Sequence, residues 1–224
     1  GDPNGKPILL FHGAPGSRLF HPYANITTRL GVRLICVERP GYGLSTFQPN
    51  RRILDWPKDV AALADSLGLD SFAIAAHSGG CPHGLACAYA LPDRVRAVAV
   101  LSGGGPPDAP GVTEGMNLLN KFGFAFGRYI PWPIFRLLMW FFFHEDAAHP
   151  ADLVQRDTGK RARADDEVFA IPEIRENCIQ SDVEAFRQGL LPFAWEVYLI
   201  TRPWGFPINE IKVPIYLWHG TADD

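Results

Sequence analysis

The chain has 224 residues, of which 47% are hydrophobic and 20% charged, and its formal net charge is −3 at pH 7. This composition is typical of a globular protein with one sizeable core, and it excludes a disordered chain. Because the charge is close to balanced, the sequence shows no basic footprint for nucleic acid, and we expect no nucleic-acid partner.

The cysteines and the apolar segments limit the classes further. The four cysteines are Cys36, Cys81, Cys87 and Cys178. They form no CxxC pair and no metal-ligand spacing, so we expect free thiols in a reducing, cytoplasmic compartment and no metal or other cofactor. The most apolar window, 130–143, is shorter than the roughly 20 residues that a bilayer requires, and it includes Arg136 and two prolines. We therefore expect no membrane span and no signal peptide.

Short apolar runs and helical patterns alternate in the first two-fifths of the chain. The apolar runs predict buried strands within 7–13, 32–41, 72–80 and 95–105. Helical patterns lie between them, through about residue 29, at 55–69 and at 81–94. Apolar strands without polar alternation, separated by helices, indicate an α/β protein whose mostly parallel sheet is covered by helices on both faces.

The helix at 55–69 has the clearest pattern. Asp55 is its predicted N-cap and Gly68 its predicted end. Four residues at helical spacing are expected to face the core: Val60, Leu63, Ala64 and Leu67.

After the glycine- and proline-rich stretch 103–111, the pattern changes. From about 112 to 195 the sequence predicts helices rich in Phe and Trp, with no convincing strand. The stretch 213–224 then restores a strand followed by glycine and acidic residues. A helical block inserted into a strand-helix series is expected to form a lid over the carboxyl ends of the strands, where open parallel sheets bind ligands.

The loops after the predicted strands carry the chemistry. They read HGAPGSR (12–18), ERPGYGLS (38–45), HSGGC (77–81) and HGTADD (219–224). Together they resemble the α/β-hydrolase fold superfamily, in particular small serine hydrolases with an HG-x-PG loop before the nucleophile and an HG-x-x-D loop after the lid. The resemblance covers nearly the whole chain. It implies a hydrolase core at 1–106, a helical lid at 107–195 and a continued core at 196–224.

Ser78 is the predicted nucleophile. A serine between a strand and a helix needs a strained turn, and small residues two before and two after it leave room for that turn. Ala76 and Gly80 occupy those positions, so the sequence departs from the family pattern G-x-S-x-G by one methyl group. We expect the geometry to tolerate Ala76. A Ser-Gly-Gly stretch also makes ordinary turns, and only its context favours the nucleophile.

The resemblance also implies an oxyanion hole. Its two donors would be the backbone N–H groups of Gly79 and Ala14, which would stabilise the negative oxygen that forms during acyl transfer. His12 and Gly13 are expected to shape the loop, with the His12 imidazole bonded to the backbone. Pro15 completes the tight turn.

The HG-x-x-D pattern implies that Asp223 is the catalytic acid that orients a histidine. Asp224 beside it and Asp108 on an earlier loop are the competing candidates, and His219 is expected to be structural. In this fold the histidine follows the acid, yet no residue follows Asp224 and none of the seven histidines lies at the expected place. We therefore expect the histidine beyond Asp224, and the chain to be a fragment that lacks both ends of the fold and is inactive alone.

The lid aromatics suggest the kind of substrate. Most of them are expected to pack lid helices on the core, but His77, Trp140 and Phe143 are the predicted pocket residues. An apolar pocket favours small hydrophobic esters over peptides or sugars. An interfacial role for 134–143 is a weaker alternative interpretation, and the charge run 156–167 is expected to be a solvated face.

The preferred interpretation is a cofactor-free serine hydrolase that forms an acyl-enzyme on Ser78. Peptidase, C–C hydrolase and perhydrolase activities stay open, whereas serine instead of aspartate at position 78 argues against epoxide hydrolases and dehalogenases. A proline iminopeptidase is disfavoured because its HGGPG loop is HGAPG here. A non-catalytic ligand-binding protein of the same fold is the alternative from another class. The sequence does not fix the oligomeric state.

Overall fold

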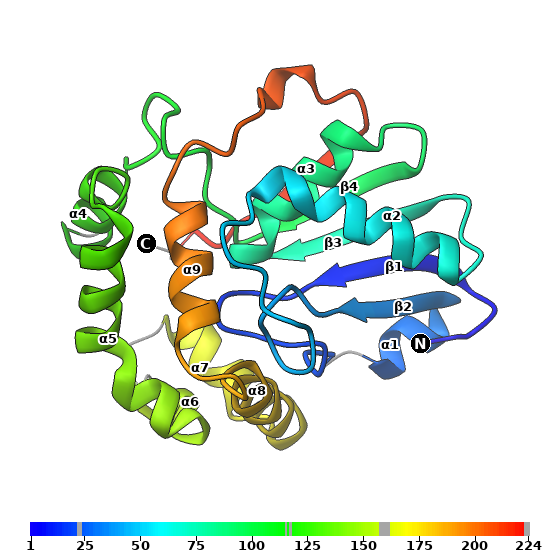
Figure 1. Cartoon of the computed structure of the whole chain (residues 1–224). Coiled ribbons are helices and arrows are strands. Elements are labelled where there is room, and N and C mark those ends of the chain that lie inside the picture. Colours follow the sequence, from blue (N-terminus) through cyan, green and yellow to red (C-terminus); the bar gives the residue numbers. More distant parts are fainter. Residues whose placement is uncertain (22–23, 115, 117, 157–161, 222–224) are drawn as a thin grey trace.

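The computed structural model describes residues 1–21, 24–114, 116, 118–156 and 162–221. Five parallel strands form one sheet in the order β2-β1-β3-β4-β5 (Figure 1). The strands are β1 (Lys6–Phe11), β2 (Val32–Val37), β3 (Phe72–His77), β4 (Val95–Leu101) and β5 (Ile215–Trp218). The predicted parallel sheet of an α/β protein is confirmed.

Three helices accompany the first strands: α1 (Ala24–Arg29), α2 (Trp56–Ser66) and α3 (Cys81–Ala90). Helices α2 and α3 lie on the same face of the sheet (Figure 1). Phe72, Ile74 and Ala76 of β3 point toward them and are buried, while Ala73 and Ala75 on the opposite face are half-buried. The predicted flanking of the sheet by helices is confirmed, since α2 and α3 pack on this face and α1 contacts β2.

Helix α2 follows the predicted pattern. Val60 and Ala64 are fully buried, and Leu63 and Leu67 pack against the same core. Gly68 ends the helix with a φ of 64°. Asp55 is the N-cap residue of α2 as predicted, but its side chain makes no cap bond to the helix. Its carboxylate instead accepts the backbone N–H of Arg52, at 2.7 Å, in the 3₁₀ turn η1 (Ile53–Asp55).

A helical segment, here defined as α4 to α9, lies between β4 and β5 in the chain and near the carboxyl ends of the strands (Figure 1). Helix α9 runs to Ile200, beyond the predicted boundary at 195, and contacts the turn after β3. None of the described helices is long and apolar enough to cross a membrane. The helices are α4 (Leu118–Gly127), α5 (Trp132–Ala148), α6 (Leu153–Arg156), α7 (Arg163–Phe169), α8 (Pro172–Ala185) and α9 (Leu191–Ile200), with 3₁₀ turns η3 (Pro150–Asp152) and, after α9, η4 (Ile208–Glu210).

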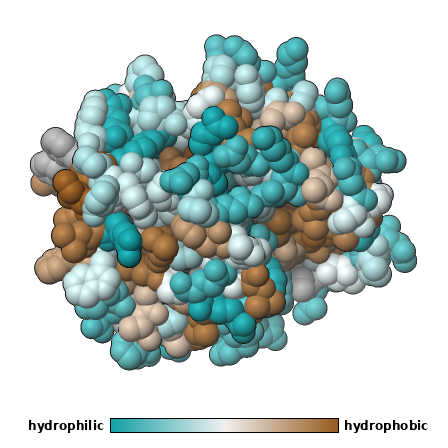
Figure 2. All heavy atoms as spheres, viewed as in Figure 1, coloured by the Kyte–Doolittle hydropathy of each residue, from teal (hydrophilic) through white to brown (hydrophobic). Residues whose placement is uncertain are grey.

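Helix α5 packs one side on the segment and exposes the other. Phe135 and Met139 are buried in a core with Phe193 of α9. The exposed side is strongly apolar, and Figure 2 shows hydrophobic residues at that edge of the molecule. Most of the predicted aromatic residues pack in this core, and the exposed ones are on α5, which has more apolar residues than its buried side can hold. The exposed apolar residues of α5 are Ile134, Leu137, Leu138, Trp140, Phe141 and Phe142.

Candidate active site

Ser78 stands at the carboxyl end of β3, where the chain turns sharply into α3. Its φ of 47° lies in the left-handed region, which non-glycine residues rarely adopt. Ser78, Gly79 and Gly80 form the 3₁₀ turn η2, and the Cys81 N–H donates to the Ser78 carbonyl oxygen. The side chain of Ser78 is half-buried and lines two cavities. This is the strained strand-turn-helix geometry that a nucleophile elbow requires.

Small residues around Ser78 make this turn possible. A Cβ at Gly80 would lie 2.7 Å from the carbonyl oxygens of both Phe11 and His12, so no side chain fits there. Ala76 is fully buried, and a Cβ at Gly84 of α3 would lie 2.9 Å from its methyl group. The methyl of Ala76 is therefore accommodated because the facing position on α3 is a glycine.

The loop after β1 touches the turn that carries Ser78. A Cβ at Gly79 would lie 2.7 Å from the Ala14 Cβ and 3.2 Å from the Ala14 nitrogen. The Gly13 carbonyl accepts a hydrogen bond from Arg39 Nη2 at 2.8 Å and contacts His12 Nδ1 at 2.8 Å. In a planar trans peptide the C=O and the next N–H point in opposite directions. The Ala14 N–H is therefore turned away from the buried guanidinium.

The same geometry orients the amide of Gly79. Because the Ser78 carbonyl accepts the Cys81 N–H, the Gly79 N–H across that peptide bond points the other way. Among the hydrogen bonds of the described residues, neither the Ala14 nor the Gly79 N–H is a donor to another protein group. Two neighbouring backbone donors are thus available to an acceptor placed beside Ser78.

A buried charged cluster lies beneath these two loops. Arg39 Nε donates to Glu196 Oε1 at 2.7 Å, and both side chains are fully buried. The other carboxylate oxygen of Glu196 accepts from Arg51 Nη2. Arg51 Nη1 lies 3.4 Å from His83 Nε2, and His83 Nδ1 lies 3.3 Å from the Gly79 carbonyl oxygen. Glu196 belongs to α9, so the cluster joins the helical segment to the core.

Charges in this cluster follow from burial and neighbours. Burial holds the pKa of His12 well below its usual value and lowers the pKa of His83 to about 3, so both imidazoles are neutral at pH 7. Burial alone would raise the pKa of Glu196, but the guanidinium groups of Arg39 and Arg51 hold it well below its usual value. Two guanidinium groups and one carboxylate leave a buried net positive charge beneath the Ala14–Gly79 contact.

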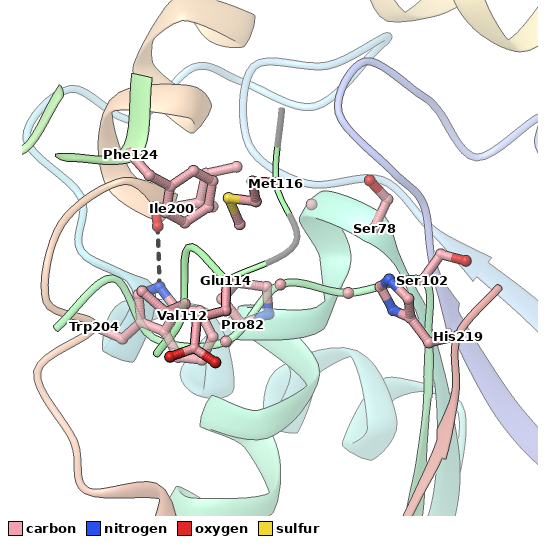
Figure 3. A pocket seen from close by; sticks show the side chains of 14 residues that line it. Ser78, Pro82, Ser102, Val112, Glu114, Met116, Phe124, Ile200, Trp204 and His219 are labelled. Atoms are coloured by element: carbon pink, nitrogen blue, oxygen red, sulfur yellow. Dashed lines mark hydrogen bonds between the residues drawn. The ribbon is translucent and has the colours of Figure 1, made fainter. Parts of the chain in front are cut away.

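Ser78 lies between two cavities of about 530 and 600 Å³. Such volumes are typical of small-molecule sites. In the described chain, Glu114 of the first cavity and Asp182 of the second are the acidic lining residues, and no Lys or Arg lines either one. Apolar residues of the first cavity (Figure 3) include Val112, Met116, Phe124, Ile200 and Trp204. Those of the second include Phe20, Leu153, Val154 and Phe169.

Two histidines lie near Ser78 without bonding to it. His77 stacks on Phe20 with ring centroids 5.4 Å apart and lines the second cavity. His219 is exposed and lies beside Ser102 in the first cavity, while the Ser78 hydroxyl points away from it (Figure 3). Within the described residues, no side chain is hydrogen-bonded to Ser78 Oγ.

Of the three candidates for the catalytic acid, only Asp108 lies among the described residues. Asp223 and Asp224 lie outside the described residues. Asp108 is exposed and lines neither of the two cavities. In the described part of the chain, no cluster of His, Cys, Asp and Glu could hold a metal ion, and the four cysteines are free thiols.

The other two predicted pocket residues lie elsewhere. Trp140 is 55% exposed and stacks on His144 with ring centroids 4.7 Å apart. Phe143 packs edge-on against Phe193 with centroids 5.4 Å apart. Neither residue is among those that line the two cavities beside Ser78.

Sequence reasoning missed the buried cluster of Arg39, Arg51 and Glu196. A signal for it was present, because Glu196 is the only charged residue of the otherwise apolar helix LPFAWEVYLI. A carboxylate in such a helix requires a buried cation. Arg39, two residues after β2, is the matching partner.

The comparisons with known proteins agree with this fold. The sequence model of the alpha/beta hydrolase fold family matches residues 6–134, more than half of the chain. The chain belongs to the α/β-hydrolase fold family. A carboxylesterase structure from Nitrososphaera gargenis superposes on this α/β-hydrolase chain with a TM-score of 0.64 at 18% identity, covering 99% of the chain and 74% of that structure.

Two curated relatives match shorter stretches of this α/β-hydrolase chain. A 2-hydroxy-6-oxononadienedioate/2-hydroxy-6-oxononatrienedioate hydrolase from Burkholderia vietnamiensis is 31% identical over 125 residues, which are 51% of this chain and 43% of the relative. A probable proline iminopeptidase from Leptolyngbya boryana is 31% identical over 97 residues, which are 42% of this chain and 30% of the relative. In both cases the matched stretch spans less than half of the relative.

Proposed function

We propose that this protein is a serine hydrolase that cleaves small hydrophobic esters through an acyl-enzyme. The observation that carries the proposal is the left-handed turn at Ser78, which sets a half-buried hydroxyl between two apolar cavities and beside two free backbone N–H groups. An ester has an acyl part and an alcohol part on either side of its carbonyl carbon. Two cavities that meet at Ser78 can hold one part each.

The reaction would proceed in two acyl transfers. Ser78 Oγ attacks the ester carbonyl carbon, and a histidine outside the described residues accepts the hydroxyl proton, oriented by Asp223. The carbonyl oxygen becomes an oxyanion and accepts hydrogen bonds from the Ala14 and Gly79 N–H groups. The histidine then protonates the departing alcohol, which leaves an acyl-Ser78 ester. Water attacks this ester by the same steps in reverse and releases the carboxylic acid.

The lining of the cavities favours neutral esters over dicarboxylates. Glu114 lines the first cavity, and among the described lining residues of both cavities there is no Lys or Arg to pair with an anionic substrate. A dicarboxylate such as the dienedioate in the name of the Burkholderia relative would place negative charge against the Glu114 carboxylate. We therefore rank C–C hydrolysis of a dicarboxylate below ester hydrolysis.

The test is covalent labelling of the full-length protein with a fluorophosphonate, followed by mass mapping of the labelled peptide. We expect the label on Ser78, no label in Ser78→Ala, and hydrolysis of p-nitrophenyl esters with acyl chains of graded length. Labelling of another residue would show that Ser78 is not the nucleophile, and a protein that binds esters without being labelled or releasing acid would support a non-catalytic ligand-binding protein. Hydrolysis of only the dienedioate or of a prolyl peptide would favour the activities named for the two relatives.

A further inference from the structure

Glu196 and Arg39 connect the helical segment to the loop that carries Ala14, although neither lines a cavity beside Ser78. Arg39 uses Nε for Glu196, at 2.7 Å, and directs its other two nitrogens at the loop after β1. Nη2 donates to the Gly13 carbonyl at 2.8 Å, and Nη1 donates to the His12 carbonyl. One buried side chain therefore donates hydrogen bonds to two successive carbonyls of the loop and to the Glu196 carboxylate of α9.

The hydrogen bonds from Arg39 determine where the Ala14 N–H points. The Gly13 carbonyl and the Ala14 N–H belong to the same rigid peptide unit, so fixing the first fixes the second. Arg39 is itself fixed in rotation, because its planar fork is held by Glu196 on one side and by the carbonyls on the other. The guanidinium is fully buried and has no solvent to replace these partners.

Arg51 provides an internal contrast. It is also buried and also pairs with Glu196, but its remaining contact is with His83 and not with the loop after β1. His83 in turn meets the Gly79 carbonyl, which belongs to the peptide of Gly80 and not to that of the Gly79 N–H. Two arginines thus share one carboxylate, and only Arg39 reaches the peptide that carries a predicted oxyanion donor.

We propose that Arg39, anchored by Glu196 of α9, is a positioning residue that aims the Ala14 N–H at the oxyanion. The helical segment then contributes to catalysis through the loop after β1 as well as through the walls of the substrate cavities. This inference rests on the proposed ester hydrolysis. It assigns to the pair Arg39–Glu196 a role in the transition state and none in substrate binding.

The test compares two charge-conserving variants of the full-length protein, Arg39→Lys and Arg51→Lys. An ammonium group keeps the charge that Glu196 needs but cannot hold a carboxylate and two carbonyls in one plane. We expect Arg39→Lys to lower kcat by about ten- to a hundredfold with KM nearly unchanged, the scale of a misplaced catalytic group. Binding of a trifluoromethyl ketone, which forms an oxyanion on the serine, should weaken by a similar factor. Arg51→Lys should keep kcat and inhibitor binding within about threefold.

The rates are expressed per active site, counted by fluorophosphonate titration, so that a loss of folded protein does not lower kcat. Glu196→Asp is the second variant. Its shorter side chain keeps the charge but cannot bridge both arginines, and we expect a smaller loss of kcat in the same direction. If Arg39→Lys does not fold, the kcat of Glu196→Asp tests the proposal instead.

Equal effects of Arg39→Lys and Arg51→Lys, or a fall in stability with wild-type kcat and inhibitor affinity, would show that the cluster only supports the fold. If the wild-type protein is not labelled at Ser78 and hydrolyses no ester, the proposed function fails and this inference fails with it. A labelled, active wild type with unaffected variants overturns the inference alone.

Discussion

The contact between Gly79 and Ala14 gives a prediction that is sensitive to geometry. In Gly79→Ala the new methyl carbon would lie 2.7 Å from the Ala14 Cβ, whereas ordinary van der Waals contact begins at 3.4 Å. The two backbones must separate by roughly the difference, about 0.7 Å. A hydrogen bond of about 2.9 Å lengthened by this amount is no longer a hydrogen bond. Loss of one oxyanion donor costs about a hundred- to a thousandfold in kcat, or roughly 3–4 kcal/mol of transition-state stabilisation.

The assay measures kcat and KM of the full-length protein on a p-nitrophenyl ester, with active sites counted by fluorophosphonate. We expect Gly79→Ala to lower kcat and leave KM nearly unchanged. The double variant Ala14→Gly/Gly79→Ala removes the methyl group that the new side chain meets, so part of the lost activity should return. Gly123→Ala is the matched control, because a Cβ there has nothing within 4 Å and Gly123 lines neither cavity beside Ser78.

Two results would refute this reasoning. If Gly79→Ala keeps its kcat within about threefold, the amides of Gly79 and Ala14 do not hold the oxyanion. If it loses activity and the double variant recovers none, the loss does not come from the contact with the Ala14 methyl group.

Three further predictions follow from Ser78, His83 and the cavity walls. Ser78→Gly and Ser78→Ala should both abolish ester hydrolysis. Only glycine relieves the φ of 47°, so the free energy of urea unfolding of Ser78→Gly should exceed that of Ser78→Ala by about 1 kcal/mol. Equal stability of the two variants would mean that the turn is unstrained. Because the pKa of His83 falls from 6.5 to about 3 on folding, the unfolded chain takes up a proton at a higher pH than the folded chain, and the free energy of unfolding should fall as the pH drops from 6.5 toward 3. In His83→Gln the free energy of urea unfolding should depend less steeply on pH, by about 1.4 kcal/mol per pH unit near pH 5. An unchanged pH dependence would contradict the buried neutral imidazole. Phe20→Ala should raise KM about tenfold for the longer esters while Trp140→Ala leaves KM within twofold, and the reverse order would place the pocket at α5.

The fold was predictable because it depends on local patterns that tertiary contacts reinforce. Apolar runs closed by glycine predicted all five strands, and the helical spacing of Val60 and Ala64 placed their side chains in the core. The turn at Ser78 was predictable for the same reason, since serine followed by two glycines after a buried strand leaves few backbone solutions. The sequence did not show which N–H the Asp55 carboxylate would bind. It accepts the nearby N–H of Arg52 and not an N–H of α2, and residue spacing does not distinguish these two donors.

The pocket was harder to predict because it depends on which way each helix of the segment is turned. Trp140 and Phe143 are aromatic and close in sequence to buried residues, but α5 exposes the first and packs the second on α9. Phe20, from the loop after β1, lines a cavity instead. A sequence shows that aromatic surface exists, but the rotation of a helix about its axis is set by its partners.

The sequence by itself determined the parallel α/β sheet, the sharp turn at Ser78 and the glycines around it, because each of these is dictated by residues within one turn or one strand. Only the tertiary structure decided that Ala14 meets Gly79 and that Glu196 reaches Arg39 across 157 positions of the chain. Such contacts depend on how separate loops and helices are brought together. Their energy comes from burial and pairing that exist only once the chain has folded.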